Sequence, residues 1–278
     1  MAWSFPLRRA GMLSIGALLG FAAPALHADG LRLGVGVDYS SGKYGGRETT
    51  DILSAPLWLG YSRGRFDAKL TVPYLRVKGP GDVIPGLTPV VDDDEREDDE
   101  DEEDDPLTPE DESEIPTTTE SGIGDVTLSA NFAVVDQPDA WRLAIGGKIK
   151  FPTADEDKNL GSGETDYAAH IDIERALGHL TPFLTIGHRW LGDPPDASYK
   201  NAWYASVGVL WSVRDGTSLD FTYDWGQASS NSTDDGSELS LGFSQRLGRD
   251  LRLQGYVLYG LSDGSPDWGG GASLTYYF

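Results

Sequence analysis

The chain has 278 residues, no cysteine and a net charge of −23. The missing cysteines exclude a disulfide framework and thiol chemistry, and the negative charge argues against nucleic acid as a partner because phosphate groups would repel the protein. The mean hydropathy is mildly negative, and no stretch of 18 apolar residues follows the N-terminal region. This excludes a helical membrane protein but not a β-barrel, in which only alternate residues face lipid.

The N-terminus has the pattern of a secretory signal. Arg8 and Arg9 precede an apolar run over residues 10–25, and small residues follow at a position suited to signal peptidase. The run is short and rich in Gly, unlike a membrane-spanning helix. We therefore predict a cleaved signal peptide over residues 1–28 and export from the cytoplasm.

From residue 31 onward, apolar and polar residues alternate in segments that are separated by turn signals. The predicted strands are 31–40, 50–61, 65–76, 122–135, 140–151, 165–175, 179–190, 201–212, 217–227, 237–247, 250–261 and 269–278. An even number of alternating strands is typical of a bacterial outer-membrane barrel. We expect residues 29–278 to form an all-β, transmembrane, antiparallel up-and-down β-barrel of about 12 strands, within the range 10–14.

The connections between these strands alternate between short and long, as periplasmic turns and extracellular loops do in a barrel. One face of the strands is apolar, and the other carries many charges of both signs. Charges in such numbers cannot share a dry core, but they can line a wet lumen. A soluble β-sandwich is the alternative, and it gives no reason for the sorted connections.

Two prolines, Pro56 and Pro73, lie on neighbouring predicted strands and point into the barrel. Because proline cannot donate to the hydrogen-bond ladder, each marks a bulge or a local break in pairing. They are candidates for a lateral opening through which an apolar substrate could leave, and the alternative is a local kink.

A strongly acidic run covers residues 92–114, with 17 Asp or Glu residues against the single Arg96. Like charges repel, so we predict a disordered extracellular loop at about residues 79–120. Such a run condenses Ca²⁺ or Mg²⁺ loosely and without an ordered ligand pattern. The candidate metal-binding residues are Asp98, Asp99, Glu100, Asp101, Glu102, Glu103, Asp104 and Asp105. No other cofactor is expected.

Charged and polar residues on the inward face are candidates for the lumen and the substrate path. They are Lys69, Asp125, Arg142, Lys148, Lys150, His170, Asp172, Glu174, Asp220 and Asp224. One interpretation is a network of salt bridges that stabilises the barrel. The other is a pore constriction in which Lys148 and Lys150 face Asp172 and Glu174.

Three short motifs occur in the middle of the chain. They are Gly122-Ile123-Gly124-Asp125 at a strand start, Lys150-Phe151-Pro152-Thr153 at a strand end, and Gly161-Ser162-Gly163 in a connection expected to be flexible. The arrangement resembles the outer-membrane barrel family named after the MetA pathway of phenol degradation, which is distantly similar to long-chain fatty-acid transporters. The resemblance implies uptake of small aromatic or apolar compounds. Ala154 departs from that family, which usually has Gly at this position.

The last predicted strand ends with Tyr276 and Phe278, which share its apolar face. These aromatics resemble the C-terminal signal that the barrel-assembly machinery recognises, so that machinery is an expected partner. Outer-membrane lipid and lipopolysaccharide are expected around the apolar band of a barrel in a Gram-negative outer membrane.

The sequence thus predicts a non-enzymatic channel or transporter for small molecules, with aromatic or apolar compounds as candidate substrates. The first alternative is a surface structural or divalent-cation-binding barrel that acts through the acidic loop. A more remote alternative is an outer-membrane hydrolase, for which His188 is the candidate histidine, although no Gly-x-Ser-x-Gly pattern accompanies it.

Overall fold

The structure is a computed structural model that describes residues 29–46, 48–81, 83–85, 117–137, 140–194, 199–230 and 234–278. The predicted signal peptide and the acidic run 92–114 lie outside these ranges. In the described part of the chain, no helix is long and apolar enough to cross a membrane. The elements of these ranges are thirteen strands and a 3-10 turn, η2 (Glu156–Lys158).

The strands follow one another along the chain with few interruptions. They are β1 (Gly30–Gly42), β2 (Thr50–Arg63), β3 (Phe66–Gly79), β4 (Thr118–Ile123), β5 (Val126–Asp136), β6 (Trp141–Phe151), β7 (Asp166–Arg175), β8 (Leu180–Trp190), β9 (Ala202–Arg214), β10 (Thr217–Gly226), β11 (Gly236–Leu247), β12 (Leu251–Gly260) and β13 (Trp268–Tyr277).

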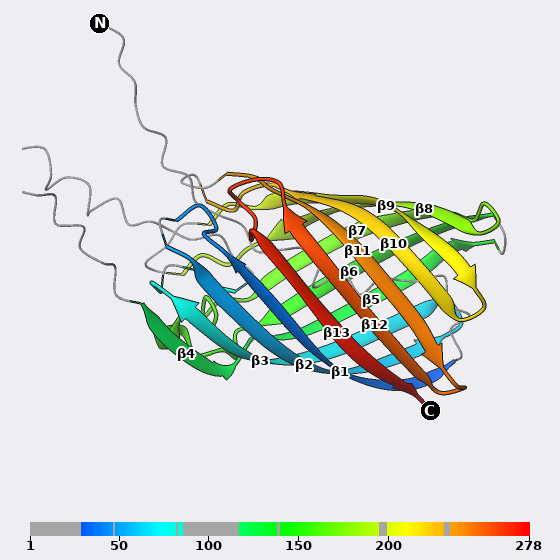
Figure 1. The fold of residues 1–278 in the computed structure, drawn as a ribbon, viewed down its shortest axis with the longest axis horizontal. Helices are drawn as coiled ribbons and strands as arrows, with labels where there is room; N and C mark the ends of the chain where they lie inside the picture. The colour runs from blue at the N-terminus through cyan, green and yellow to red at the C-terminus, as the bar shows by residue number, and fades with distance from the viewer. Residues whose placement is uncertain are drawn as a thin grey trace, which may run out of the picture.

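These strands form one closed antiparallel barrel (Figure 1). Neighbours in sequence pair with each other, and β1 pairs with β13 over ten residue pairs to close the wall. β4 and β5 both pair with β3, one after the other, so they occupy a single position in the wall. The thirteen strands therefore make the predicted twelve-stranded barrel.

The fourth predicted strand, 122–135, is interrupted at Gly124 and Asp125, between β4 and β5. β4 begins at Thr118, within the stretch 79–120 that the sequence predicts to be a loop, and it pairs only with β3. β4 lies beside the last six residues of β3, at the end of the barrel where the long connections lie (Figure 1). The other predicted strand bounds agree with the structure to within three residues.

The sorted connections are confirmed. The turns after β2, β7, β9 and β11 are two to four residues long, whereas the connections at the opposite rim have seven or more residues. Gly64, Gly178, Gly216 and Gly248 have positive φ in these four short turns, a conformation that costs glycine little. The end of β13 lies at the rim with the short turns (Figure 1).

The outer face of the barrel is apolar, which reverses the arrangement in a soluble protein. Most of the large hydrophobic side chains are exposed, for example Val207 at 51% and Phe221 at 50%. Exposed tryptophans lie at both rims, and Trp203 and Trp211 bracket Val207 on one face of β9. Because a soluble monomer rarely exposes a large contiguous apolar surface, this band indicates contact with lipid, flanked by interfacial aromatic belts.

Candidate functional site: the lumen cavity

The barrel encloses a cavity of about 390 Å³, here called the lumen cavity. Its lining combines polar and apolar residues from nearly every strand position around the wall. Of the predicted lumen residues, Lys69, Asp125, Lys148, Lys150 and Asp220 line it. Strand alternation points these side chains inward while their neighbours in sequence face lipid.

Large side chains lie flat against the wall because glycines on neighbouring strands leave room for them. A Cβ at Gly34 would lie 2.2 Å from ring atoms of Trp58, and a Cβ at Gly187 would lie 2.2 Å from the Tyr204 ring. Trp58 and Tyr204 both line the cavity. Sequence reasoning did not single out these rings, and the inward glycines were the available signal.

This arrangement predicts that Gly34→Ala narrows the pore, because the added methyl group forces the Trp58 ring away from the wall. We expect the single-channel conductance in KCl to fall by roughly half, because the displaced ring would occupy part of the lumen through which ions flow. Gly36→Ala is the matched control, since a Cβ at Gly36 would lie no closer than 3.2 Å to any neighbour. Equal conductance of the two variants would contradict this account of Trp58.

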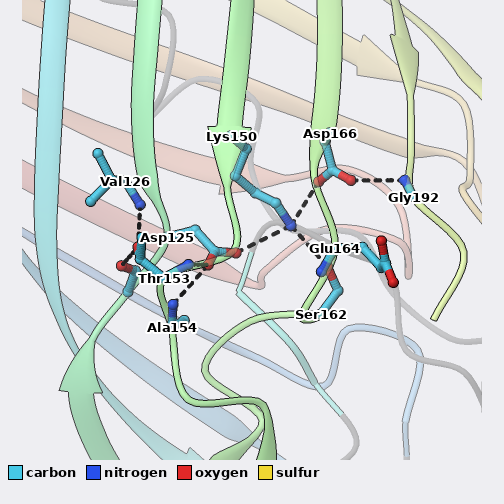
Figure 2. A network of polar contacts seen from close by, with 10 residues as sticks. Asp125, Val126, Lys150, Thr153, Ala154, Ser162, Glu164, Asp166 and Gly192 are labelled. Carbon is cyan, nitrogen blue, oxygen red and sulfur yellow. Dashed lines mark hydrogen bonds and ion pairs between the residues drawn. The ribbon is translucent and has the colours of Figure 1, made fainter. Parts of the chain in front are cut away.

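The three motifs in the middle of the chain meet in one polar network at the end of the barrel that carries the long connections (Figure 2). Asp125 Oδ1 accepts hydrogen bonds from the backbone amides of Thr153 (3.1 Å) and Ala154 (3.0 Å). Thr153 Oγ1 in turn donates to Gly124 O (3.0 Å) and accepts from Val126 N (2.9 Å). The end of β6 is thereby tied to the break between β4 and β5.

Lys150 holds the other side of this network (Figure 2). Its Nζ atom lies 3.1 Å from Asp125 Oδ2 and 2.8 Å from Asp166 Oδ2, and it donates to Ser162 Oγ at 2.9 Å. The expectation of a flexible connection at 159–163 does not hold, because this connection between β6 and β7 is bound to the wall and Leu160 is 1% exposed.

Leu160 belongs to an apolar cluster that the loops place over the inner wall. It packs with Tyr44 and Val83, from two other connections, against inward side chains of β2 and β3. The Tyr44 hydroxyl donates to Ser40 Oγ at 2.9 Å, and burial raises the pKa of that hydroxyl. The cluster covers the inner wall of β2 and β3 at the end of the barrel that carries the long connections. Only the folded loops create it, so no strand pattern could indicate it.

The predicted constriction between Lys148 and Lys150 on one strand and Asp172 and Glu174 on the next is wrong. In the register of β6 and β7, Lys148 lies opposite Ala168 and Lys150 opposite Asp166. Because antiparallel strands run in opposite directions, the acidic pair at the end of β7 meets the start of β6 instead.

The remaining predicted residues of β6 and β7 lie nearer the rim with the short turns and outside the cavity lining. Arg142 pairs with Glu174 at 3.0 Å. Asp172 accepts from Thr185 Oγ1 at 2.7 Å and lies 3.4 Å from His170 Nε2. These contacts support the interpretation in which the inward charges form salt bridges that stabilise the barrel.

Acidic residues gather on another part of the wall. Asp220 lines the cavity and its Oδ2 atom is buried without a hydrogen-bond partner. Asp224 accepts from Ser206 and lies opposite Glu238 in the register of β10 and β11. Asp38, on β1, accepts from the Tyr256 hydroxyl at 2.9 Å. Glu238 and Tyr256 were not among the predicted residues, although their inward positions follow from strand alternation.

Pro56 and Pro73 lie directly opposite each other, and the pairing of β2 and β3 continues through both. The structure has no opening between these two strands. The pairing is interrupted on their other sides, between β1 and β2 beside Pro56 and at the β4–β5 break beside Pro73. The predicted local break is therefore present, and the lateral opening stays a prediction.

The structure gives no support to two further predicted sites, the metal site and the hydrolase site. Asp98 to Asp105 lie outside the described residues, and within the described ranges no group of three or more His, Asp or Glu residues could hold a metal ion. The His188 ring packs 4.7 Å from the rings of both Trp190 and Trp203, and its Nδ1 atom is buried without a hydrogen-bond partner.

Tyr276 and Phe278, at the end of the last strand, stack edge to face at 5.0 Å. Their role in assembly stays a prediction.

Solved structures share this fold. The COG4313 outer membrane channel from Pseudomonas putida F1 aligns with a TM-score of 0.67 at 15% identity, covering 91% of this chain and 97% of that one. The NanC porin aligns with a TM-score of 0.53 at 12% identity, covering 88% and 99%. The KdgM porin aligns with a TM-score of 0.52 at 8% identity, with the same coverage. These similarities show that the chain shares the β-barrel fold of the channel and the two porins.

No curated protein matches the sequence. A family profile does match it, over residues 54–278, which is most of the barrel and includes the three motifs joined by Asp125 and Lys150. The expected resemblance is therefore confirmed. The chain belongs to the family described as "Putative MetA-pathway of phenol degradation".

Proposed function

We propose that the protein is a non-enzymatic outer-membrane channel that lets small molecules, including aromatic or apolar compounds, pass through the barrel. The lumen cavity carries this proposal: it is lined by polar residues together with Trp58, Pro56 and Tyr204. Polar groups keep a pore wet, whereas the rings offer apolar surface to an aromatic solute. The family description and the channel and porin neighbours support the same class of function.

The proposal includes partners of the outer surface. Lipid and lipopolysaccharide would cover the apolar band, and the barrel-assembly machinery would recognise Tyr276 and Phe278. No cofactor is required for passage through a pore. Any Ca²⁺ or Mg²⁺ held by the acidic run would act outside the lumen. A cleaved signal peptide over residues 1–28 would direct export.

Conductance and solute uptake test the channel. We expect the folded protein to give discrete current steps in a planar bilayer and to let arabinose swell proteoliposomes, because water-filled barrels pass small solutes. Proteoliposomes that contain the heat-denatured protein are the control. A heat-modifiable band on a gel would show that the protein is folded. A folded protein that gives neither current steps nor swelling would overturn the proposal.

A further inference from the structure

Three cations of the lumen cavity lie on one row across the sheet. Lys69 is opposite Ser129, Ser129 is opposite Lys148, Lys148 is opposite Ala168, and Ala168 is opposite Arg189. The cations are thus two strands apart, about 10 Å between backbones, and small residues separate them. Long side chains can therefore converge over Ser129 and Ala168, and all three cations line the cavity.

No carboxylate in the described part of the chain lies within ion-pair distance of these three cations, although Asp38 and Asp67 attract Lys69, and Asp166 attracts Lys148 and Arg189, from farther away. The Nε and Nη2 atoms of Arg189 are buried without a hydrogen-bond partner. The Lys148 ammonium interacts with the like charges of both neighbours. The Arg189 donors that lack partners and the repulsion among the three cations both favour the binding of an anion beside the row.

Lys150, on the same face of β6, provides the contrast. Its ammonium already binds Asp125 and Asp166 in the network of Figure 2. Asp125 and Asp166 therefore form their ion pairs with Lys150, which lies two residues after Lys148 on β6. The cation row is left facing the cavity.

An aromatic ring lies beside each end of the row. Lys69 Nζ is 6.0 Å from the centroid of the Trp58 ring, which lies flat over Gly34. Tyr204 lies over Gly187, two residues from Arg189 on the same strand face. A planar apolar body could stack on either ring while its charged group meets the cations.

Acidic residues also line the cavity. Asp38 lies on β1 and Asp220 on β10. In the order of strands around the barrel, β1 is two positions from β3 and β10 is two positions from β8, so the two carboxylates lie to either side of the row. An anionic group would be repelled by both carboxylates and drawn to the cation row between them.

We propose that the lumen cavity binds small aromatic carboxylates, with the carboxylate on Lys69, Lys148 and Arg189 and the ring against Trp58 or Tyr204. The proposal rests on the channel function and names its substrate class. Guanidinium and ammonium groups bind carboxylates through charge-assisted hydrogen bonds. The apolar lining favours an aromatic body over a sugar.

Binding is tested by isothermal titration of the folded barrel in detergent with benzoate, benzyl alcohol and benzylamine, which share a ring and differ in charge. We expect benzoate to bind at least about tenfold more tightly than benzyl alcohol, because a charged hydrogen bond is worth more than a neutral one. Benzylamine should bind most weakly. Equal affinities for benzoate and benzyl alcohol would overturn the proposal.

Lys148→Met keeps the length of the side chain and removes its charge. It should weaken benzoate binding about tenfold and leave benzyl alcohol binding unchanged. Because the substitution also removes repulsion within the row, the barrel should fold normally. Arg252→Met is the matched control: Arg252 stacks on Tyr277 at 5.7 Å and lies outside the cavity lining, so benzoate affinity should stay within about twofold of the wild type.

The two proposals can fail separately. Arabinose uptake without a preference for benzoate would overturn the carboxylate site and leave the channel. Benzoate binding that is lost in Lys148→Met, in a protein that passes no solute, would support the site and overturn the channel. Unchanged benzoate affinity in Lys148→Met would overturn the site by itself.

Discussion

Val207→Arg should destabilise the barrel by roughly 2–4 kcal/mol, the cost of a cation on the lipid face near the bilayer midplane. Val207 is 51% exposed and lies midway between Trp203 and Trp211 on the outer face of β9. The eight-residue step from Trp203 to Trp211 spans roughly 27 Å of strand, or roughly 20 Å of height at a tilt of about 40°. We expect a lower urea midpoint in lipid vesicles and less heat-modifiable protein in the outer membrane.

Two controls separate charge from size. Val207→Met adds length without charge and should behave almost as the wild type. Gln254→Arg places the same cation on the inward face of β12, where Gln254 lines the lumen cavity, and it should assemble well because the lumen is wet. If Val207→Arg and Gln254→Arg were equally stable, the assignment of inner and outer faces would be wrong.

Lys150→Met should destabilise the barrel by about 3 kcal/mol, because removing one member of a buried ion-pair network leaves the others without a counter-charge. The side chains of Lys150, Asp125 and Asp166 are 15%, 9% and 13% exposed. Asp125 also anchors the backbone at Thr153, so we expect the connection between β6 and β7 to loosen. A lower urea midpoint and noisier open-channel currents should report the two effects.

Lys158→Met is the matched control for Lys150→Met. The Lys158–Asp155 pair has the same 3.1 Å separation as Lys150–Asp125, but its side chains are 45% and 44% exposed. Exposed pairs contribute about 0–1 kcal/mol, so the urea midpoint should hardly change. Neutralising both acids in D125N/K150M/D166N should recover part of the lost stability. A similar loss in Lys158→Met and Lys150→Met would contradict the role of burial.

The network around Lys150 changes the interpretation of the three sequence motifs. The sequence pattern indicates a family and places Asp125 and Lys150 on the substrate path. In the structure these two residues bind each other, and Asp125 ties the end of β6 to the β4–β5 break. The motifs therefore brace the wall at this end of the barrel. Asp125 and Lys150 line the cavity as Lys148 does, but they are paired with each other.

The fold is closely predictable because its signals are local. A strand in a barrel wall has one side toward lipid and one toward water, so each residue's polarity reports its side. The length of each connection likewise indicates at which rim of the barrel it lies. For these reasons the twelve positions in the wall and the sorted connections follow from the amino-acid sequence. The family follows from the resemblance of the three motifs and is confirmed by the profile match.

The sequence by itself therefore determined the barrel, the face on which most strand residues lie and many of the inward charges. Only the tertiary structure decided which of those charges meet. A two-residue shift in register keeps every side chain on the same face, so polarity alone does not fix the register. The pairing of β6 with β7 places Lys150 against Asp166 and leaves Lys148 opposite Ala168. Loop packing, which buries Leu160 and Tyr44 over the inner wall, also depends on contacts that no local period encodes.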